Sequence, residues 1–469
     1  MQRLIRRLLG RPADWHLYRP RLRLPRPSLA WVGTVAVIAS CAVSWLAFDG
    51  TRGEDGDVSF GLWVGAVSIL LMAWSFVLAV RIRPLERWFG GLDSMYRVHR
   101  WAGAFSVLFM FLHTRAEPEI EGGVLGAGRA VADSAEGLAG TGEIMLYVLV
   151  GLSALRWMPY RWWRWTHKLL GVPFAFASWH FFTAEKPYAN GSGWGWWFGG
   201  FMLAGLIAWI ARIGVRDAAA QGRRHRITSA RTEGSTTTIE MEPVGRPLQH
   251  RSGQFVFLKV QARGLREPHA FTIASAPGAS RLRFVIRDLG DWTARLCERV
   301  ERDGLVGSEV IVEGPYGEFR PVGRRGQPVV WIAGGVGITP FLAAIDDAGP
   351  DPTIVPHLLY AVRSADENGV VEELRRAASA GRIRLTVFES SAGRRLSPAD
   401  LDPTVGRDLA GAHVALCGPA SLVADMAAAA RRGGAAEIET EDFDIRQGFG
   451  PDLSADIDEL VRTRRPSHA

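Results

Sequence analysis

Cysteine is scarce in this chain. The sequence has 3 cysteines among 469 residues, Cys41, Cys297 and Cys417, and they lie far apart. So few scattered thiols exclude a disulfide framework and a cysteine-rich zinc site. We therefore expect the hydrophilic half of the chain to work in a reducing cytoplasm.

A single basic face is also missing. The chain carries 55 Lys and Arg against 48 Asp and Glu, a net charge of +7, but much of the positive charge lies beside apolar runs. Arginine in such places sets the orientation of a membrane protein and does not mark a nucleic-acid site. We therefore expect the lipid bilayer, and not nucleic acid, as a partner, and no obligatory protein partner is evident.

The first half of the chain contains long apolar stretches. Several approach the ~20 residues that a helix needs to cross a bilayer. The first stretch starts late and no small-residue cleavage site follows it, so we do not expect a cleaved signal peptide. The six stretches are residues 29–48, 60–80, 98–114, 142–156, 162–183 and 195–211.

The loops between these stretches alternate in charge. Residues 1–28 carry eight arginines and one acidic residue, and segment 81–100 is also rich in arginine. Loops 49–59 and 114–141 lean acidic. Because cytoplasmic loops collect Lys and Arg, the pattern predicts a multi-pass protein of the cell (inner) membrane, with the N-terminus and the C-terminal half in the cytoplasm.

Four of the eleven histidines lie within or at the edge of these stretches: His99, His113, His167 and His180. Ionisable groups at membrane depth are costly and usually functional. The third and fifth stretches run in the same direction, so His99 shares a depth with His167, and His113 with His180. Fourteen residues rise roughly 21 Å along a helix. Two such pairs have the arrangement for two bis-histidine haems stacked across the bilayer; the alternative is interfacial histidines without a metal.

The two spacings differ in the helix face that they select. Fourteen residues at ~100° each return close to the starting face, whereas thirteen do not. His180 is therefore expected off the face of His167 in a regular helix. Pro173 between them offers a kink that re-aims the second ring.

The H-x13-H and H-x12-H spacings on the third and fifth of six stretches resemble the NADPH oxidase and ferric reductase family. The resemblance implies that His99 and His167 bind an inner haem b. It also implies that His113 and His180 bind an outer haem b.

After an arginine-rich joint near 212–226, the pattern changes to alternating β-strands such as 237–242 and 253–260. In 267–277, EPHAFTIASAP, an aromatic stands next to a hydroxyl, which suits stacking on a flavin and hydrogen bonding to its ring. In 284–296, FVIRDLGDWTARL, a strand ends at Arg287 and a helix begins near Thr293. Free N–H groups at a helix N-terminus bind phosphate, although Thr293 by itself also fits a plain N-cap.

Residues 329–345, VVWIAGGVGITPFLAAI, read as a strand, a glycine loop and a helix. In this context Gly334, Gly335 and Gly337 let the backbone approach a pyrophosphate. Cys417 ends a later strand where a nicotinamide would lie; its alternative role is a small buried hydrophobe. Strands at 356–362, 382–389 and 412–417 alternate with helices near 370–380 and 420–432, as in a parallel βαβ sheet.

In this order the pieces resemble the ferredoxin–NADP reductase-type flavin module of the same family, with Ala270 in place of the proline of the usual H-P-F-T. The resemblance implies that His269, Phe271 and Thr272 contact FAD. The residues near its ribityl-pyrophosphate arm would be Arg287, Gly290, Trp292 and Thr293.

The same resemblance places the nicotinamide nucleotide on the second lobe. Its further contacts would be the glycine loop through Thr339 and Pro340, together with Cys417, Gly418 and Pro419. Phe443 would lie over the flavin ring, and Thr272, Cys417 and Phe443 are the expected catalytic residues. Arg363 follows the second strand of this lobe. A cation at this position suits the 2′-phosphate of NADPH better than the free 2′-hydroxyl of NADH, so we expect NADPH, with NADH as the alternative.

The predicted architecture is a six-helix transmembrane bundle, an antiparallel β-barrel FAD domain and an α/β parallel-sheet NAD(P)H domain. The expected boundaries are 1–28 for a basic N-terminus, 29–214, 222–323 and 328–449 for the three domains, and 450–469 for a tail. We expect electrons to pass from NADPH through FAD and two b-type haems to oxygen outside, giving superoxide. A ferric chelate or a periplasmic protein is the alternative acceptor; a haem-free tethered diaphorase and a haem-binding sensor are rival functions.

Overall fold

The computed structural model describes residues 31–53, 56–120, 122–155, 158, 160–215, 222–234, 236–302, 304–323, 326–349, 354–365, 369–401 and 409–442. The chain forms two compact units: residues 1–219 with 446–469 (unit 1), and residues 220–445 (unit 2).

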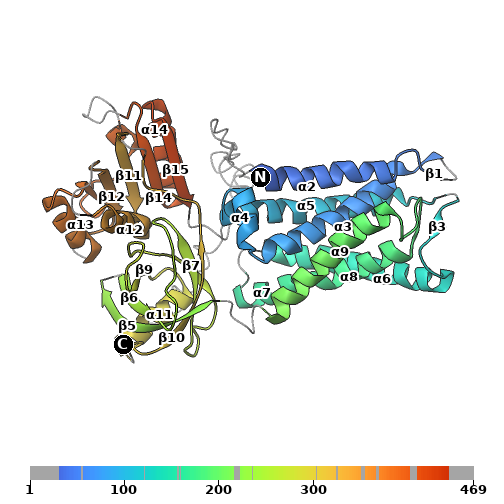
Figure 1. Cartoon of the computed structure of the whole chain (residues 1–469), viewed down its shortest axis with the longest axis horizontal. Helices are drawn as coiled ribbons and strands as arrows, with labels where there is room; N and C mark the ends of the chain where they lie inside the picture. The colour runs from blue at the N-terminus through green and yellow to red at the C-terminus, as the bar shows by residue number, and fades with distance from the viewer. Residues whose placement is uncertain are drawn as a thin grey trace, which may run out of the picture. The chain divides into compact units, whose positions relative to one another are not determined.

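Unit 1 is built mainly of helices (Figure 1), with two short antiparallel strand pairs: β1 (Arg52–Gly53) with β2 (Gly56–Asp57), and β3 (Val124–Leu125) with β4 (Glu185–Lys186). Among its described residues, Ser59–Ala79, Arg129–Ala154 and Gly193–Ile213 are long and apolar enough to cross a membrane. The helices are α2 (Val32–Val43), η3 (Ser44–Ala47), α3 (Ser59–Ala79), α4 (Arg83–Phe89), α5 (Leu92–Ala116), α6 (Arg129–Ala154), α7 (Tyr160–Lys168), α8 (Gly171–Thr183), α9 (Gly193–Ile210) and the π-helical turn η4 (Ala211–Val215).

Two of the predicted stretches differ from the helices that carry them. The fourth was expected to begin at residue 142, but α6 begins at Arg129. The fifth, 162–183, is divided into α7 and α8, with the break at Leu169 and Leu170. The break precedes Pro173, which lies in the first turn of α8. A proline ring clashes with the carbonyl four residues earlier, here that of Leu169, so the helix is interrupted at that point.

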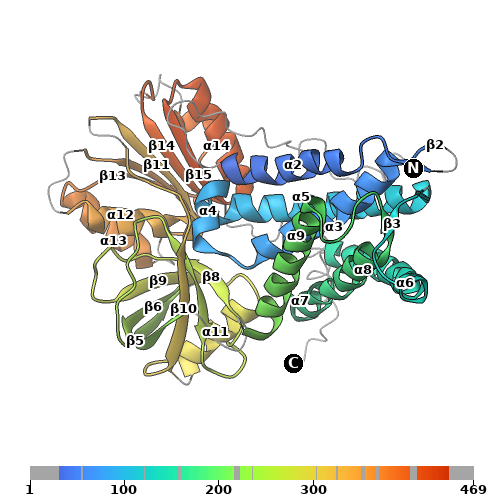
Figure 2. The ribbon, with the colours of Figure 1, turned by 45° about the vertical axis from the view of Figure 1, so that its right-hand side comes forward.

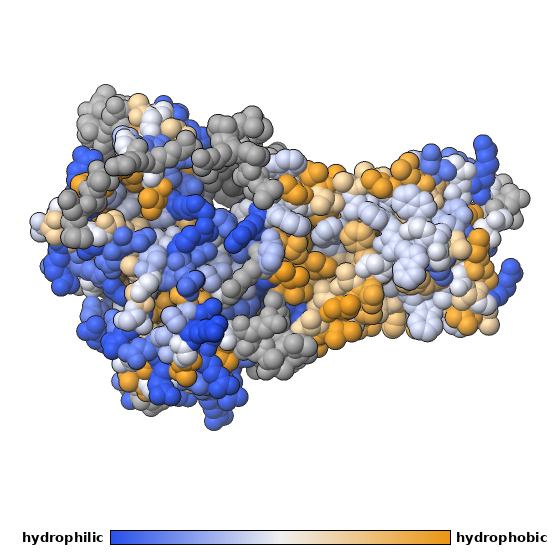
Figure 3. Space-filling model, viewed as in Figure 1, coloured by the Kyte–Doolittle hydropathy of each residue, from blue (hydrophilic) through white to orange (hydrophobic). Residues whose placement is uncertain are grey.

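The helices of unit 1 keep many large apolar side chains on their surface. Ile38, Ile144 and Trp196 are 62%, 67% and 75% exposed. Unit 1 therefore shows orange and pale patches in Figure 3, whereas the face of unit 2 is mainly blue. Contiguous apolar surface of this extent needs a non-aqueous environment, which lipid provides.

The first lobe of unit 2 is a six-stranded antiparallel sheet. Its strands are β5 (Arg223–Glu233), β6 (Thr236–Pro243), β7 (Phe255–Val260), β8 (His269–Thr272), β9 (Leu282–Arg287) and β10 (Glu309–Tyr316), in the order β8-β7-β10-β5-β6-β9. The sheet is curled, because Ala274, just after edge strand β8, donates from its N–H to the carbonyl of Arg283 in the other edge strand at 2.8 Å. Helix α11 (Asp291–Arg302) packs into its core through Trp292 and Leu296.

The second lobe is a parallel sheet with helices on both faces (Figure 2). Strand β11 alternates its contacts: Trp331 packs with α12 and α13, whereas Ile332 packs with α14. The predicted strands and helices here are confirmed; the polar edge strand β15 was not expected. The strand order is β13 (Arg384–Glu389), β12 (His357–Val362), β11 (Val329–Gly334), β14 (His413–Gly418) and β15 (Glu437–Asp442), with helices α12 (Thr339–Asp347), α13 (Gly369–Ser379) and α14 (Ala420–Arg432).

Candidate functional site

The first histidine pair, His99 and His167, joins α5 and α7. The ring centroids are 5.9 Å apart and the ring planes are inclined by 70°. Nδ1 of His99 lies 2.8 Å from both the carbonyl oxygen and the hydroxyl of Ser75 in α3. Nδ1 of His167 lies 3.0 Å from the hydroxyl of Ser153 in α6. With each Nδ1 held by a serine, Nε2 is the nitrogen left for a metal on either ring.

The second pair, His113 and His180, joins α5 and α8. Nδ1 of His113 lies 2.8 Å from the carbonyl oxygen of Gly61 in α3. Nδ1 of His180 is buried and has no hydrogen-bond partner among the residues that the structure describes.

The His99–His167 pair suits a haem better than a bare ion. No group of three or more His, Cys, Asp or Glu side chains able to hold a metal ion occurs in the described part of the chain. A porphyrin needs only two axial ligands from the protein. Two imidazoles that bind one metal from opposite sides at ~2 Å have ring centroids about 6 Å apart. The His99–His167 distance therefore fits bis-histidine ligation.

Strand β8 carries the predicted flavin contacts. The ring of His269 stacks on Trp292 with a centroid distance of 4.5 Å, and Phe271 lies 5.6 Å from the same indole. Thr272 is 5% exposed, and its hydroxyl has no partner among the described residues. An unpaired buried hydroxyl costs free energy, so a flavin that hydrogen-bonds to Thr272 fits this strand.

The turn between β9 and α11 is closed by Thr293. Its hydroxyl accepts hydrogen bonds from the N–H groups of Leu289 and Gly290 at 2.9 and 3.0 Å. Thr293 is the third residue of α11 and is therefore not the N-cap that was its alternative role; its hydroxyl holds the N–H groups of the turn just before the helix. A contact of Thr293 or Gly290 with FAD stays a prediction.

A cavity of unit 2 combines two of the predicted arginines with the glycine loop. The Arg287 guanidinium lies within 3.4 Å of the position that a β-carbon of Gly335 would take. The Tyr360 hydroxyl donates to the carbonyl of Gly335 at 3.0 Å, and Gly335 adopts a φ of 54°. Residues Thr236, Val285, Arg287, Gly335, Val336, Ile338, Tyr360, Val362, Arg363, Ser364 and Val370 line the cavity.

The other loop glycines serve packing within the lobe. A β-carbon on Gly334 would lie 2.8 Å from Pro419, and one on Gly337 would overlap the carbonyl of Cys417. A β-carbon on Gly418 would lie 3.0 Å from the nitrogen of Gly334. The loop and the end of β14 therefore approach each other closely, and Gly335 alone of the three predicted loop glycines lines the cavity.

The remaining predicted residues lie around this loop or outside the described chain. Thr339 and Pro340 are buried at the start of α12. Cys417 is fully buried in a hydrophobic cluster at the end of β14. Phe443 lies outside the described residues.

Two family models match this chain. One describes a ferric reductase like transmembrane component and covers residues 64–178; the other describes an FAD-binding domain and covers residues 223–320. Human dual oxidase 2 is 32% identical over 134 residues, which are 26% of this chain and 9% of that protein. The chain belongs to the ferric reductase and NADPH oxidase family.

Plant relatives from both branches of the ferric reductase and NADPH oxidase family match at similar levels. Respiratory burst oxidase homolog protein A of Solanum tuberosum is 31% identical over 132 residues, 24% of this chain and 14% of that protein. Ferric reduction oxidase 7, chloroplastic, of Arabidopsis thaliana is 32% identical over 115 residues, 21% of this chain and 15% of that protein. The matched regions thus span 9% to 15% of these three relatives' own lengths.

Sequence reasoning about this family member missed the partners of the histidines. Ser75, Ser153 and Gly61 hold three of the four rings through Nδ1. Trp163 stacks on His167 with a centroid distance of 4.9 Å. The available signal was a serine inside an apolar segment, because a polar side chain at membrane depth needs a partner.

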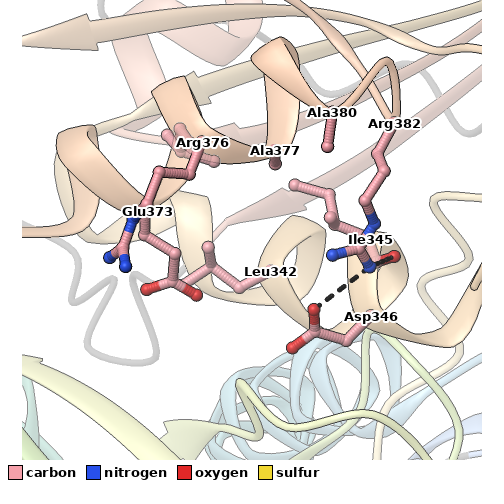
Figure 4. A pocket seen from close by; sticks show the side chains of 9 residues that line it. Leu342, Ile345, Asp346, Glu373, Arg376, Ala377, Ala380 and Arg382 are labelled. Carbon is pink, nitrogen blue, oxygen red and sulfur yellow. Dashed lines mark hydrogen bonds and ion pairs between the residues drawn. The ribbon is translucent and has the colours of Figure 1, made fainter. Parts of the chain in front are cut away.

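A second cavity lies between α12 and α13 and contains none of the predicted site residues (Figure 4). Its Arg382 pairs with Asp346 at 3.2 Å. Glu373 on its rim receives two hydrogen bonds from Arg283 of β9, at 2.7 and 2.6 Å. This pairing raises the pKa of Arg283. The Arg283–Glu373 pair links the two lobes of unit 2.

Proposed function

We propose that this chain passes electrons from cytoplasmic NADPH across the membrane to an acceptor on the outer side. When bound, FAD and two b-type haems would supply the redox chemistry that connects the nucleotide to that acceptor. The observation that carries the proposal is the His99–His167 pair, with its rings 5.9 Å apart and each Nδ1 held by a serine.

The four histidines would act as axial ligands. His99 and His167 would hold the inner haem, and His113 and His180 the outer one. Because α5 carries one ligand of each pair, a single rigid helix would fix the spacing of the two sites. The break after Lys168 separates the other two ligands and gives His180 its own helix direction.

Unit 2 would bind the flavin and the nucleotide. Thr272 would hydrogen-bond the flavin ring, with His269, Phe271 and Trp292 providing apolar contact. Arg287 and Arg363 line one cavity with Gly335, and two cations there would favour a phosphorylated nucleotide. NADPH is therefore the proposed donor, with NADH as the weaker one.

The charges of the loops support an orientation. Segment 81–100 with its arginines would lie inside, and the acidic loops 49–59 and 114–141 outside. Unit 2 would then lie in the cytoplasm, where NADPH is available. The proposed location is the cell (inner) membrane.

Oxygen is the proposed acceptor, and superoxide the product. The similarity to dual oxidase 2 and a respiratory burst oxidase homolog supports this choice. A ferric chelate is the second candidate, because the match to a ferric reductase like component and the similarity to ferric reduction oxidase 7 support it equally.

A visible spectrum of the purified full chain in lipid nanodiscs tests the proposal first. We expect two b-type haems per chain and their reduction by added NADPH without oxygen. If the chain contains no haem, the rival function of a membrane-tethered diaphorase is supported. If haem is present but NADPH does not reduce it, the rival function of a haem-binding sensor is supported. His99→Ala and His180→Ala should each lower the haem content, whereas His357→Ala, in strand β12 of unit 2, should not.

NADPH consumption then identifies the acceptor. Superoxide formed in proportion to NADPH consumed in air supports the oxidase. If NADPH is consumed at an equal rate without oxygen but with ferric citrate, the oxidase assignment is overturned in favour of the ferric reductase.

A further inference from the structure

The hydroxyl of Ser153 has a defined direction. It donates a hydrogen bond to the carbonyl of Leu149 at 2.7 Å, one turn earlier in α6. Its single proton is therefore used, and Oγ faces Nδ1 of His167 at 3.0 Å with a lone pair. Nδ1 of His167 must carry the proton in this contact, so Nε2 keeps its lone pair.

Trp163 completes a clamp around the same ring. Its indole N–H donates to the carbonyl of Ser153 at 3.0 Å. Its ring lies against His167 with a centroid distance of 4.9 Å and an interplanar angle of 10°. Ser153 thus holds His167 in two ways. Its hydroxyl contacts the ring directly, and its carbonyl binds the Trp163 indole that stacks on the ring.

The opposite ring, His99, is held in a different way. Its Nδ1 lies 2.8 Å from the backbone carbonyl of Ser75 as well as from the Ser75 hydroxyl. A backbone carbonyl remains when the side chain is removed. His167 depends on a side chain for its acceptor, and His99 does not.

We propose that Ser153 is the positioning residue that sets the tautomer and orientation of His167, and thereby tunes the reduction potential of the inner haem. The inference rests on the proposed function, because it takes His167 as an axial ligand. A residue that holds the far nitrogen of a ligating histidine raises the basicity of that ligand and fixes its plane.

The direction of the effect follows from the chain of hydrogen bonds. Since the Ser153 hydroxyl donates onward to Leu149, its oxygen is a stronger acceptor for the His167 N–H. A more basic imidazole stabilises ferric over ferrous iron. Loss of the hydrogen bond should weaken the preference for ferric over ferrous iron about tenfold. For a one-electron couple a tenfold change corresponds to ~59 mV, so the midpoint potential of the inner haem should rise by that amount.

The test compares Ser153→Ala with Ser75→Ala in the full-length protein in nanodiscs. Spectroelectrochemical titration and low-temperature EPR are the readouts, neither of which needs turnover. We expect Ser153→Ala to raise one of two midpoint potentials and to change the EPR signal of one low-spin haem. Ser75→Ala keeps the carbonyl acceptor of His99, so the midpoint potentials and the EPR signals of this variant should stay close to those of the wild type.

A second pair of variants covers the case in which Ser153→Ala does not fold. Ser153→Thr keeps the hydroxyl and should retain the wild-type potentials, whereas its isostere Ser153→Val should show the shift. Equal potentials and spectra in all variants, with two haems in the wild type, would overturn the inference alone. A wild type without haem would overturn the proposed function.

Discussion

The imidazole of His113 lies against the bare backbone of Gly65 in α3. A β-carbon on Gly65 would be 2.5 Å from Nδ1 of His113, which is closer than van der Waals contact allows. The same Nδ1 lies 2.8 Å from the carbonyl of Gly61, one turn earlier. The absence of a side chain at Gly65 therefore creates the space in which this ring is held.

Gly65→Ala should displace His113 and break its bond to Gly61. We expect the haem content to fall from two to about one per chain, with a loss of stability of about 1–3 kcal/mol from overpacking. A pyridine haemochrome assay measures the haem. Gly200→Ala in α9 is the matched control, because among the described residues no atom outside its own stretch of helix lies within 4 Å of the added carbon. Equal haem content in both variants would contradict the prediction.

Thr272→Val should separate flavin binding from folding. The Thr272 hydroxyl has no partner among the described residues, so its removal should leave the thermal midpoint unchanged or slightly raised. FAD affinity, measured by fluorescence titration, should fall about tenfold for the loss of one hydrogen bond.

Thr237→Val should behave in the opposite way. Thr237 is fully buried and its hydroxyl contacts Cys297 at 3.1 Å and Thr232 at 3.0 Å. This variant should lose about 1 kcal/mol of stability and keep its FAD affinity. The same FAD affinity in Thr272→Val as in the wild type would remove Thr272 from the flavin site.

Arg363→Ser should change the choice of nucleotide. Arg363 follows β12 and lines the cavity with Gly335 and Ser364, where its charge would pair with a 2′-phosphate. We expect KM for NADPH to rise about tenfold or more, since charge-assisted bonds contribute about 1.5–3 kcal/mol, while KM for NADH stays constant. Arg384→Ser, at an exposed arginine of β13, should change neither constant, and parallel increases for both nucleotides at Arg363→Ser would refute the assignment.

The bidentate pair of Arg283 and Glu373 should stabilise the contact between the lobes of unit 2. Their side chains are 22% and 30% exposed, so the pair is less screened than a surface ion pair. A double-mutant cycle with Arg283→Ala and Glu373→Ala should give a coupling of about 1–3 kcal/mol. Thermal unfolding followed by near-UV circular dichroism measures it, and additive effects would show that the pair does not act as a unit.

Several features of the fold follow from local sequence. Apolar stretches predicted helices such as α3 and α9, and the strand–glycine–helix pattern at 329–345 predicted β11 and α12. The polar strand β15, with the sequence EIETED, escaped prediction because an edge strand need not alternate apolar residues. The start of α6 at Arg129 was missed because the segment before residue 142 is too polar to be read as a membrane span.

The histidine spacing by itself indicated both pairs, but only tertiary structure decided how each ring is held. Ser153, Ser75 and Gly61 reach their histidines from other helices, and Arg287 reaches Gly335 from the other lobe. Periodicity, charge and motif order are properties of neighbours in the chain, so the sequence determined the elements and the candidate ligands. Hydrogen-bond partners and close backbone approaches join residues distant in the chain, and packing alone brings these within bonding distance.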